Sequence, residues 1–333
     1  MVTNTTVTEF VLLGFSVSPR VQTIGLSQNP RWNFILFLIF LTIYVTTWLG
    51  NLTIIFTVIF MPQLHTPMYF LLANLAALDI SDSTVTSLKL LAGLLSHSNT
   101  ISYNWCIAQI FFFHFTGASV DFLLTVMAVD RYIAIYKPLK YVMIMNQTVC
   151  ISLVASSWLG GFVHSIVQIG IIIQLPFCGP NILDNFYCDI PQVVKLACTD
   201  TYITELLMVS NSGLIVTAMF LVLLVSYSVI LVKIRTHVTE GKHKALSTCT
   251  AHMVVLSLNF VPAIFMYNRP FTVFPGDKFV SAMYTLITPM LNPMIFTLRN
   301  TEMKNAIRKL KVKMVSSKSR IFIGEKSFVS RLH

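Results

Sequence analysis

Residues 127–136 read MAVDRYIAIY and place the triplet Asp130, Arg131 and Tyr132 at the end of an apolar run that starts near Trp105. A guanidinium costs about 2.5–3.5 kcal/mol at the centre of a membrane helix. The cost is lower at the rim, where the side chain reaches water and a neighbouring carboxylate neutralises it. Asp130 is that neighbour. The triplet is therefore either a charge pair that flanks a membrane helix or an electrostatic latch at the cytoplasmic end of a signalling helix.

The composition of the chain indicates a membrane protein. Of its 333 residues, 55% are hydrophobic and 11% are charged, whereas soluble proteins carry about 25% charged residues. Residues 1–30 are polar, so we expect no signal peptide and a first membrane segment that acts as its own targeting signal. The net charge of +10 could suggest nucleic acid, but the placement of the basic residues argues against a nucleic-acid partner.

Seven apolar runs follow one another along the chain, each long enough to cross a bilayer. Because unpaired backbone groups are not tolerated in lipid, all seven are predicted to be helices. Their limits are about 33–60, 67–89, 105–133, 148–173, 203–232, 246–267 and 278–298. The predicted fold is an all-α seven-transmembrane helix bundle. We expect residues 1–32 to form an extracellular segment, 33–298 the seven-transmembrane domain, and 299–333 a cytoplasmic helix and tail.

The basic residues predict the orientation. With the N-terminus outside, six Lys and Arg residues lie on the extracellular side and seventeen on the cytoplasmic side. This is the bias of the positive-inside rule. We therefore expect a multi-pass protein of the plasma membrane with an extracellular N-terminus and a cytoplasmic C-terminus. Asn4, in Asn-Thr-Thr, would then be a glycosylation site.

A short amphipathic helix is predicted directly after the seventh span. Met303, Ile307, Leu310 and Met314 recur at three- and four-residue steps, with basic residues between them. Such a helix would lie on the anionic inner leaflet of the bilayer. A calmodulin-type target helix is the alternative.

Four cysteines, Cys106, Cys178, Cys188 and Cys198, fall on the extracellular side, where disulfides persist. They allow three pairings, and their spacing does not choose among them. The expected role is structural, because a disulfide would tie the second outer loop over the bundle.

Polar residues inside the spans are the next candidates for function. Asp79 lies in the middle of the second span, and Asn51 and Asn292 join it as polar groups in apolar helices. An intramembrane acid is a functional hypothesis by default; the alternative is an acid that neighbouring Asn side chains hold for packing. Pro262, Pro289 and Pro293 interrupt the sixth and seventh helices and predict hinges, because proline removes a backbone hydrogen bond.

Other classes of protein fit the sequence less well. There is no HExxH, GxSxG, CxxC or P-loop motif, so we expect no enzyme and no metal site. A transporter or channel remains the alternative. It would show repeated halves or several charges at mid-membrane, but only Asp79 and Asp121 are expected to lie deep.

Several sequence blocks together resemble the odorant (olfactory) receptors of the rhodopsin-like G-protein-coupled family. The resemblance runs from about Phe10 to Leu310, and the order and spacing of the blocks make it highly specific. The blocks are Gly50-Asn51, Pro67-Met68-Tyr69-Phe70 with Leu78-Asp79, MAVDRYIAIYKPLKY at 127–141, Ser226-Tyr227, KALSTCTAHM at 244–253, FMYNRP at 265–270 and PMLNPMIFTLRN at 289–300.

The resemblance implies an odorant-activated receptor that raises cyclic AMP through a stimulatory, olfactory-type heterotrimeric G protein. It also implies the pairings Cys106–Cys188 and Cys178–Cys198. A sodium ion or a proton held by Asp79, with Asn51 and Asn292, would stabilise the resting state, and no other cofactor is expected. The residues that would form the switch and contact the G protein are Asp130, Arg131, Tyr132, Tyr227, Asn292 and Pro293.

A ligand site is implied in the outer third of the bundle. By family position it is lined by Phe113, His114, Gly117, Ala118, Asn211, Ile215, Phe260, Ala263, Ile264, Tyr267, Ala282 and Thr285. Phe113, Phe260 and His114 each have a plain packing role as the alternative. Because Phe113 stands where aminergic relatives hold an aspartate, this position favours a neutral odorant over an amine.

Four positions depart from the family pattern: Val120, Val129, Tyr136 and Phe296. Val120 replaces an acid, and the nearest acid, Asp121, is rotated by about 100° around the helix. Phe296 lacks the hydroxyl that would join a water network with Tyr227. These changes concern ion binding and coupling rather than the fold.

Overall fold

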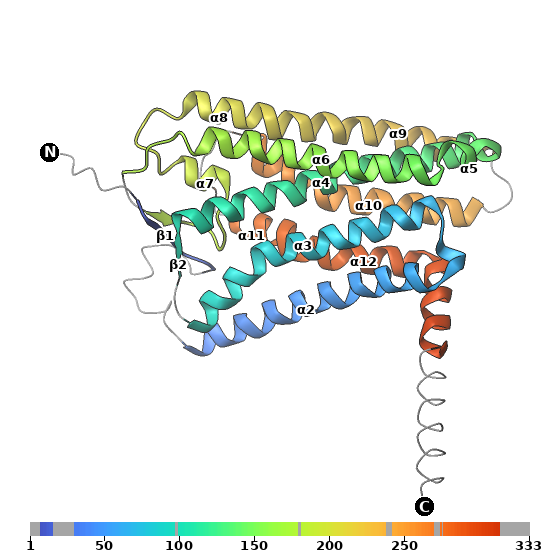
Figure 1. Cartoon of the computed structure of the whole chain (residues 1–333), viewed down its shortest axis with the longest axis horizontal. Helices are drawn as coiled ribbons and strands as arrows, with labels where there is room; N and C mark the ends of the chain where they lie inside the picture. Colours follow the sequence, from blue (N-terminus) through green and yellow to red (C-terminus); the bar gives the residue numbers. More distant parts are fainter. Residues whose placement is uncertain are drawn as a thin grey trace, which may run out of the picture.

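The long helices lie side by side and form a bundle whose two ends differ in structure (Figure 1). The computed structural model describes residues 7–15, 30–96, 99–178, 181–237, 242–269, 274 and 276–313. Each predicted span coincides with one helix of the bundle, so the predicted fold class is confirmed. The helices are α2 (Pro30–Phe60), α3 (Pro67–Ser96), α4 (Tyr103–Tyr136), α6 (Gln147–Ile172), a fifth made of α8 (Tyr202–Met208), η4 (Val209–Leu214) and α9 (Ile215–His237), α10 (Lys242–Tyr267), and a seventh made of α11 (Asp277–Ala282), η5 (Met283–Ile287) and α12 (Thr288–Arg299).

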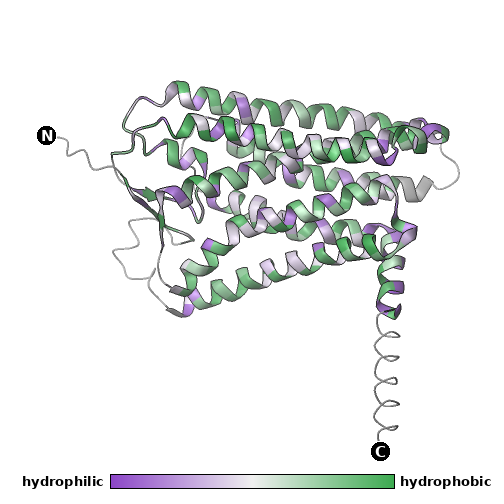
Figure 2. Cartoon of the chain, viewed as in Figure 1, coloured by the Kyte–Doolittle hydropathy of each residue, from purple (hydrophilic) through white to green (hydrophobic). Residues whose placement is uncertain are grey.

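The outer surface of the bundle is apolar. Figure 2 shows hydrophobic residues along most of the length of the long helices. Large side chains such as Leu49, Leu159 and Val225 are exposed, although such a continuous apolar surface is unfavourable in water. Among the described residues, six helices are long and apolar enough to cross a membrane. The chain is therefore a multi-pass membrane protein.

The helix α3 is not one of those six, because it carries Asp79, Asp82 and Lys89. It packs between α2 and α4, and both of its acids are buried. Its polar groups thus face the bundle interior, which is where a membrane helix keeps ionisable groups.

The helices α4 and α6 approach each other closely at Gly161. A Cβ atom there would lie 2.7 Å from the backbone oxygen of Phe115 and 2.9 Å from the backbone nitrogen of Ser119. Only glycine fits this contact, because any other side chain would push the two backbones apart.

The fifth and seventh helices each contain a π-helical segment, η4 and η5. Such a segment adds one residue to a turn, which rotates the side chains that follow it. Pro262 lies inside α10 and Pro293 inside α12, where each removes a backbone hydrogen bond. The fifth, sixth and seventh helices are therefore the irregular ones.

One end of the bundle, here called the sheet end, carries a small β-sheet. Its strands are β1 (Glu9–Leu12), β2 (Thr100–Ser102) and β3 (Ile182–Leu183), in the order β2-β1-β3. β1 runs antiparallel to β2 and parallel to β3. A short helix, α7 (Ile190–Val194), and the disulfides Cys106–Cys188 and Cys178–Cys198 lie at the same end. These pairings are the ones that the family resemblance implies, and Asn4 lies outside the described residues.

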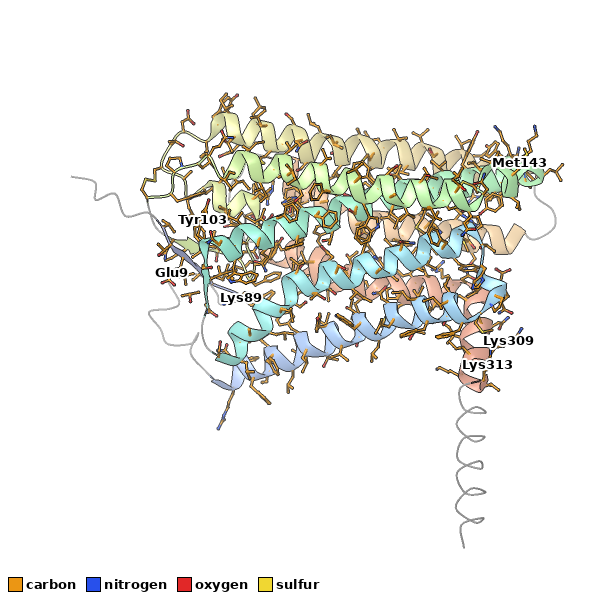
Figure 3. All side chains as sticks on the ribbon, viewed as in Figure 1. Glu9, Lys89, Tyr103, Met143, Lys309 and Lys313 are labelled. Carbon is orange, nitrogen blue, oxygen red and sulfur yellow. A yellow bond between two sulfur atoms is a disulfide. The ribbon has the colours of Figure 1, made fainter. Side chains whose placement is uncertain are left out.

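The opposite end, here called the tail end, carries η2 (Pro62–Leu64), η3 (Pro138–Lys140), α5 (Tyr141–Ile144) and a helix at 301–313. Figure 3 shows Lys309 and Lys313 on this last helix, far from Glu9 and Tyr103 at the sheet end.

The helix at 301–313 packs against the bundle by its apolar face. Met303 and Ala306 are fully buried and Leu310 nearly so. The Tyr69 hydroxyl donates hydrogen bonds to Asn300 Oδ1 at 3.1 Å and to Glu302 Oε2 at 2.9 Å. Of the four predicted apolar positions, Met314 lies outside the described residues.

Candidate functional site

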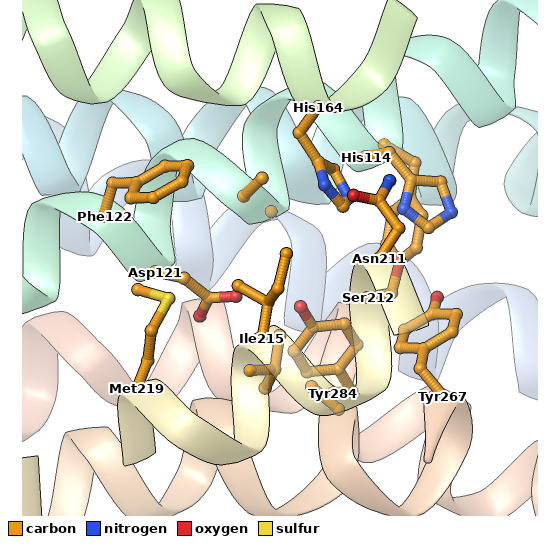
Figure 4. Close-up of a pocket in the computed structure, with 15 residues that line it drawn as sticks. His114, Asp121, Phe122, His164, Asn211, Ser212, Ile215, Met219, Tyr267 and Tyr284 are labelled. Atoms are coloured by element: carbon orange, nitrogen blue, oxygen red, sulfur yellow. The ribbon is translucent and has the colours of Figure 1, made fainter. Parts of the chain in front are cut away.

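A cavity lies inside the bundle on the side of the sheet end, between α4, α6, α9, α10 and the two π-helical segments (Figure 4). The volume open to the centres of water molecules is about 40 Å³, which holds roughly three waters. The lining residues are Phe113, His114, Gly117, Ala118, Asp121, Phe122, His164, Asn211, Ser212, Ile215, Val216, Met219, Ala263, Tyr267 and Tyr284.

Eight of the twelve residues that the resemblance assigns to a ligand site line this cavity. They are Phe113, His114, Gly117, Ala118, Asn211, Ile215, Ala263 and Tyr267. Residues far apart in the sequence, from α4 to α10, are thus brought to one place. Each of them lies on a helical turn that faces the cavity.

The other four do not line it. Phe260 is fully buried and its ring stacks on Phe220 at a centroid distance of 5.7 Å. The Thr285 hydroxyl donates to the backbone oxygen of Ser281 at 2.9 Å. Ala282 packs against the apolar cluster that includes Phe113 and Tyr267, and Ile264 is half-buried. These side chains support the walls of the bundle.

Seven lining residues were not predicted, among them Asp121, His164 and Tyr284. His164 is a polar residue in the otherwise apolar α6, and that contrast could have singled it out. Tyr284 lies in the π-helical η5, whose rotated side chains no hydrophobic pattern reveals.

Unpaired polar atoms line the cavity. Asp121 Oδ1 and Asn211 Nδ2 are buried, and no hydrogen-bond partner for them occurs in the described part of the chain. His114 Nε2 lies 3.7 Å from Asp189 Oδ1, and the rings of His114 and His164 lie 6.0 Å apart. An unpaired buried polar group is costly, so the Asp121 and Asn211 atoms are available to a ligand that supplies the missing partners.

Asp189 lies next to the cavity at the sheet end and joins the loop of Cys188 to the helices. It is fully buried and accepts hydrogen bonds from the Tyr267 hydroxyl at 3.0 Å and from its neighbour's backbone, Ile190 N, at 2.8 Å. The Tyr187 hydroxyl lies 3.4 Å from its other oxygen. Burial, and then the Asp189 charge, raises the pKa of Tyr187, so this phenol keeps its proton and donates.

The predicted ion site is partly assembled. Asn292 Nδ2 donates to both carboxylate oxygens of Asp79, at 3.1 and 3.2 Å. Asn51 instead donates to the backbone oxygens of Thr47 and Pro289, at 3.0 and 3.2 Å. The Oδ1 atoms of Asn51 and Asn292 are buried, and the described chain offers them no donor. Carboxylate and amide oxygens suit a hard cation such as sodium, so these residues fit one.

A third acid, Asp82, accompanies Asp79 and Asp121. The expectation that only Asp79 and Asp121 lie deep is wrong, because Asp82 is 7% exposed. Its carboxylate accepts a hydrogen bond from the Thr116 hydroxyl at 2.8 Å. The sequence contains a signal for this, because Asp82 follows Asp79 by three residues and this spacing returns to the same helix face.

A buried ion pair lies at the tail end of α4. Asp130 and Arg131 form a salt bridge in which Arg131 Nε donates to Asp130 Oδ2 at 3.0 Å. The Tyr141 hydroxyl donates to Asp130 Oδ1 at 2.7 Å. Burial and this hydrogen bond raise the pKa of Tyr141, so it stays a proton donor. The carboxylate is therefore held by the arginine on one side and by a phenol from α5 on the other.

The remaining residues of the predicted switch surround this ion pair or lie farther up the bundle. Tyr227 is fully buried, and within the described residues its hydroxyl has no hydrogen-bond partner. The His252 ring lies between it and Phe296, at centroid distances of 6.3 and 5.3 Å. Tyr132 stacks on Tyr136 at 4.5 Å. The missing phenol at Phe296 thus leaves Tyr227 next to rings rather than a hydroxyl.

The sequence is strongly similar to members of one family. A family profile described as "Olfactory receptor" matches residues 40–314. Olfactory receptor 4D1 of Homo sapiens is 58% identical over 308 residues, which are 92% of this chain and 96% of that receptor. Olfactory receptor 4Q2 of Homo sapiens is 55% identical over 92% of this chain and 94% of its own length. Olfactory receptor 4E2 of Mus musculus is 50% identical, with coverages of 94% and 98%.

Proposed function

The chain belongs to the olfactory receptor family. From this premise we propose how the cavity and the Asp130–Arg131 ion pair act in odorant reception. It is an odorant-activated G-protein-coupled receptor and not an enzyme. One observation carries the proposal: a single helix, α4, lines the cavity with Asp121 and Phe113 and holds the buried Asp130–Arg131 pair at its other end. The relatives give no support to the transporter or channel alternative.

The proposed topology has the sheet end outside the cell and the tail end in the cytoplasm of a plasma-membrane protein. Two disulfides at the sheet end support it, because disulfides persist on the oxidising side. The excess of Lys and Arg in the loops and tail of the other end supports it as well. Residues 1–32 are then extracellular, 33–298 form the receptor domain and 299–333 are cytoplasmic.

The proposed ligand is a small odorant that enters the cavity. Its apolar part would contact Phe113, Ile215 and Ala263, and its polar part would meet the unpaired amide of Asn211 and the His114 ring. Mostly apolar walls with a few polar groups are typical of small-molecule sites. The cavity volume requires either a very small ligand or some side-chain movement.

The proposed switch is a shift between two packings of the helices. At rest, Arg131 pairs with Asp130, which Tyr141 also holds. A ligand that binds the other packing better favours it. The ligand would contact Tyr267 on α10, and the resulting displacement of this helix would extend past Pro262 toward the tail end. Movement of the tail end of α10 would free Arg131 for a stimulatory, olfactory-type G protein. Tyr132, Tyr227, Asn292 and Pro293 belong to the same proposed switch.

We also propose that a sodium ion near Asp79, Asn51 and Asn292 stabilises the resting packing. The unpaired amide oxygen of Asn292, whose Nδ2 atom bonds the buried carboxylate, supports this role, and so does the unpaired amide oxygen of Asn51. Because Val120 supplies no acid, binding is expected to be weaker than in relatives that carry one there.

A cyclic AMP reporter assay on intact cells tests the function. The receptor, with an epitope tag at its N-terminus, is expected to raise cyclic AMP when it meets a member of a broad odorant panel. Arg131→Ala is expected to abolish that response while surface staining stays unchanged. Antibody access to the N-terminal tag without permeabilisation tests the orientation.

Two results would contradict the proposal. The first is a full odorant response from Arg131→Ala at equal surface density, because the switch would then not need the guanidinium. The second is a response that persists when the stimulatory G protein is deleted from the cells.

A further inference from the structure

Asp121 is the acid that the structure leaves without a partner. It is 7% exposed, and its Oδ1 atom is buried with no hydrogen-bond donor in the described chain. The side chain lines the cavity from α4, as Figure 4 shows. A carboxylate in the interior of a membrane bundle is expensive unless a cation or a proton neutralises it.

The two neighbouring acids differ from it in this respect. Asp79 receives two hydrogen bonds from Asn292, at 3.1 and 3.2 Å, and Asp82 receives one from Thr116, at 2.8 Å. Neither of them lines the cavity. Asp121 therefore has the only carboxylate among the fifteen lining residues, and it lacks the partners that the other two have.

The charges around Asp121 favour a cation. Asp82 lies within electrostatic range of both Asp79 and Asp121. The lining residues include no Lys or Arg. Because the effective dielectric of a bundle interior is low, these neighbouring acids attract a positive charge far more strongly than they would in water.

The surroundings of Asp121 also limit the size and shape of such a cation. Phe122, Ile215 and Met219 form apolar walls near the carboxylate, and the Tyr284 hydroxyl points toward the same part of the cavity (Figure 4). Room for roughly three waters corresponds to about five heavy atoms of a ligand, at about 30 Å³ per water. A charged head with a short apolar body fits these walls, whereas a bare metal ion leaves them without contacts.

We propose that Asp121 is the residue that selects the ligand of this cavity, and that the ligand is a small amine whose ammonium group pairs with the Asp121 carboxylate. This inference rests on the proposed function, since it names the ligand class of the same site. The sequence argument for a neutral odorant rests only on Phe113, which occupies the position where aminergic relatives hold an aspartate. Asp121 lies eight residues further along α4, about 12 Å deeper at 1.5 Å per residue.

The test compares amines with alcohols that share each carbon skeleton, such as n-pentylamine and n-pentanol, in the cyclic AMP assay. The wild-type receptor is expected to respond to the amine at a lower concentration than to the alcohol. Asp121→Asn keeps the size and polarity of the side chain and removes its charge. It is expected to raise the half-maximal amine concentration by about 30-fold or more and to shift the alcohol response much less, so that the preference for the amine is lost.

Asp82→Asn is the matched control. It removes a neighbouring acid that does not line the cavity, so it is expected to shift the amine response less than Asp121→Asn does. Surface staining of each variant separates a change in response from a loss of folding. The wild-type comparison of amine with alcohol needs no variant, so it decides the question even if Asp121→Asn does not reach the surface.

Each result supports or overturns the proposal. A wild-type receptor that answers neutral odorants and ignores every amine overturns this inference but leaves the receptor function intact. An amine response that Asp121→Asn does not weaken also overturns it. A wild-type receptor at the cell surface that answers no volatile compound, in cells where another odorant receptor responds, overturns the proposed function and this inference with it.

Discussion

Replacing Tyr141 with Phe is expected to raise ligand-independent signalling. The Tyr141 hydroxyl donates to Asp130 Oδ1 at 2.7 Å, and Arg131 Nε donates to Asp130 Oδ2 at 3.0 Å. The substitution removes the first of these bonds and keeps the ring. A hydrogen bond to a charged group contributes about 1.5–3 kcal/mol, and the half-buried position of Tyr141 indicates the lower end of that range.

The size of the effect follows from this energy. About 1.4 kcal/mol corresponds to a tenfold change in an equilibrium constant. If the bond exists only in the resting packing, its loss raises the small active fraction by about tenfold. Basal cyclic AMP, normalised to the number of receptors at the cell surface, measures that fraction. Asp130→Asn is expected to raise basal signalling as well.

Tyr202→Phe serves as the control, because Tyr202 is 68% exposed at the sheet end and its hydroxyl lies far from the ion pair. Combining Tyr141→Phe with Asp130→Asn is expected to add little to Asp130→Asn alone, because Asp130→Asn already removes the carboxylate charge that the Tyr141 hydroxyl stabilises. Unchanged basal signalling after Tyr141→Phe at normal surface density would refute the reasoning. Full additivity in the double variant would show that Tyr141 acts elsewhere.

Three further predictions concern stability, the disulfide and the ion site. Gly161→Ala, whose Cβ would lie 2.7 Å from a backbone oxygen of α4, is expected to cost about 1–3 kcal/mol and to lower the Tm of the purified receptor. Gly170→Ala in the same helix, with nothing within 4 Å, is expected to leave the Tm unchanged or to add up to about 1 kcal/mol; equal Tm values for the two variants would contradict the packing argument. Cys106→Ser breaks a disulfide and is expected to cost about 2–5 kcal/mol, which flow cytometry would detect as a larger loss of surface receptor than Cys150→Ser causes at a free cysteine. Asp79→Asn is expected to remove the effect of sodium on basal signalling, measured in sodium chloride against choline chloride; a sodium effect of the same size in the variant would argue against the ion site.

The positions of the helices follow from hydropathy alone. A backbone in lipid must satisfy its own hydrogen bonds, so seven apolar runs of sufficient length leave no other regular structure to form. The same argument explains why α3 is long and helical although Asp79 and Asp82 lower its hydropathy. The composition of a segment decides whether it lies in lipid, and the composition can be read directly from the sequence.

The lining of the cavity depends on rotations that the sequence does not display. Thr285 was expected to line it, but the neighbouring Tyr284 does so instead, because η5 is π-helical and rotates its side chains relative to a regular helix. His164 enters from α6, which approaches α4 closely only because Gly161 has no Cβ. The position of Tyr284 thus depends on the conformation of the whole segment η5, and the position of His164 depends on how closely two helices pack.

The sequence by itself determined that this chain is a seven-helix membrane receptor and that Arg131 lies beside Asp130, because both depend on neighbours along the chain. Only the tertiary structure decided which acids are satisfied. Asp79 and Asp82 find their hydrogen-bond donors on α12 and α4, whereas Asp121 finds none among the described residues. That difference arises from how helices distant in sequence pack against one another, and it determines the charge that the cavity presents to a ligand.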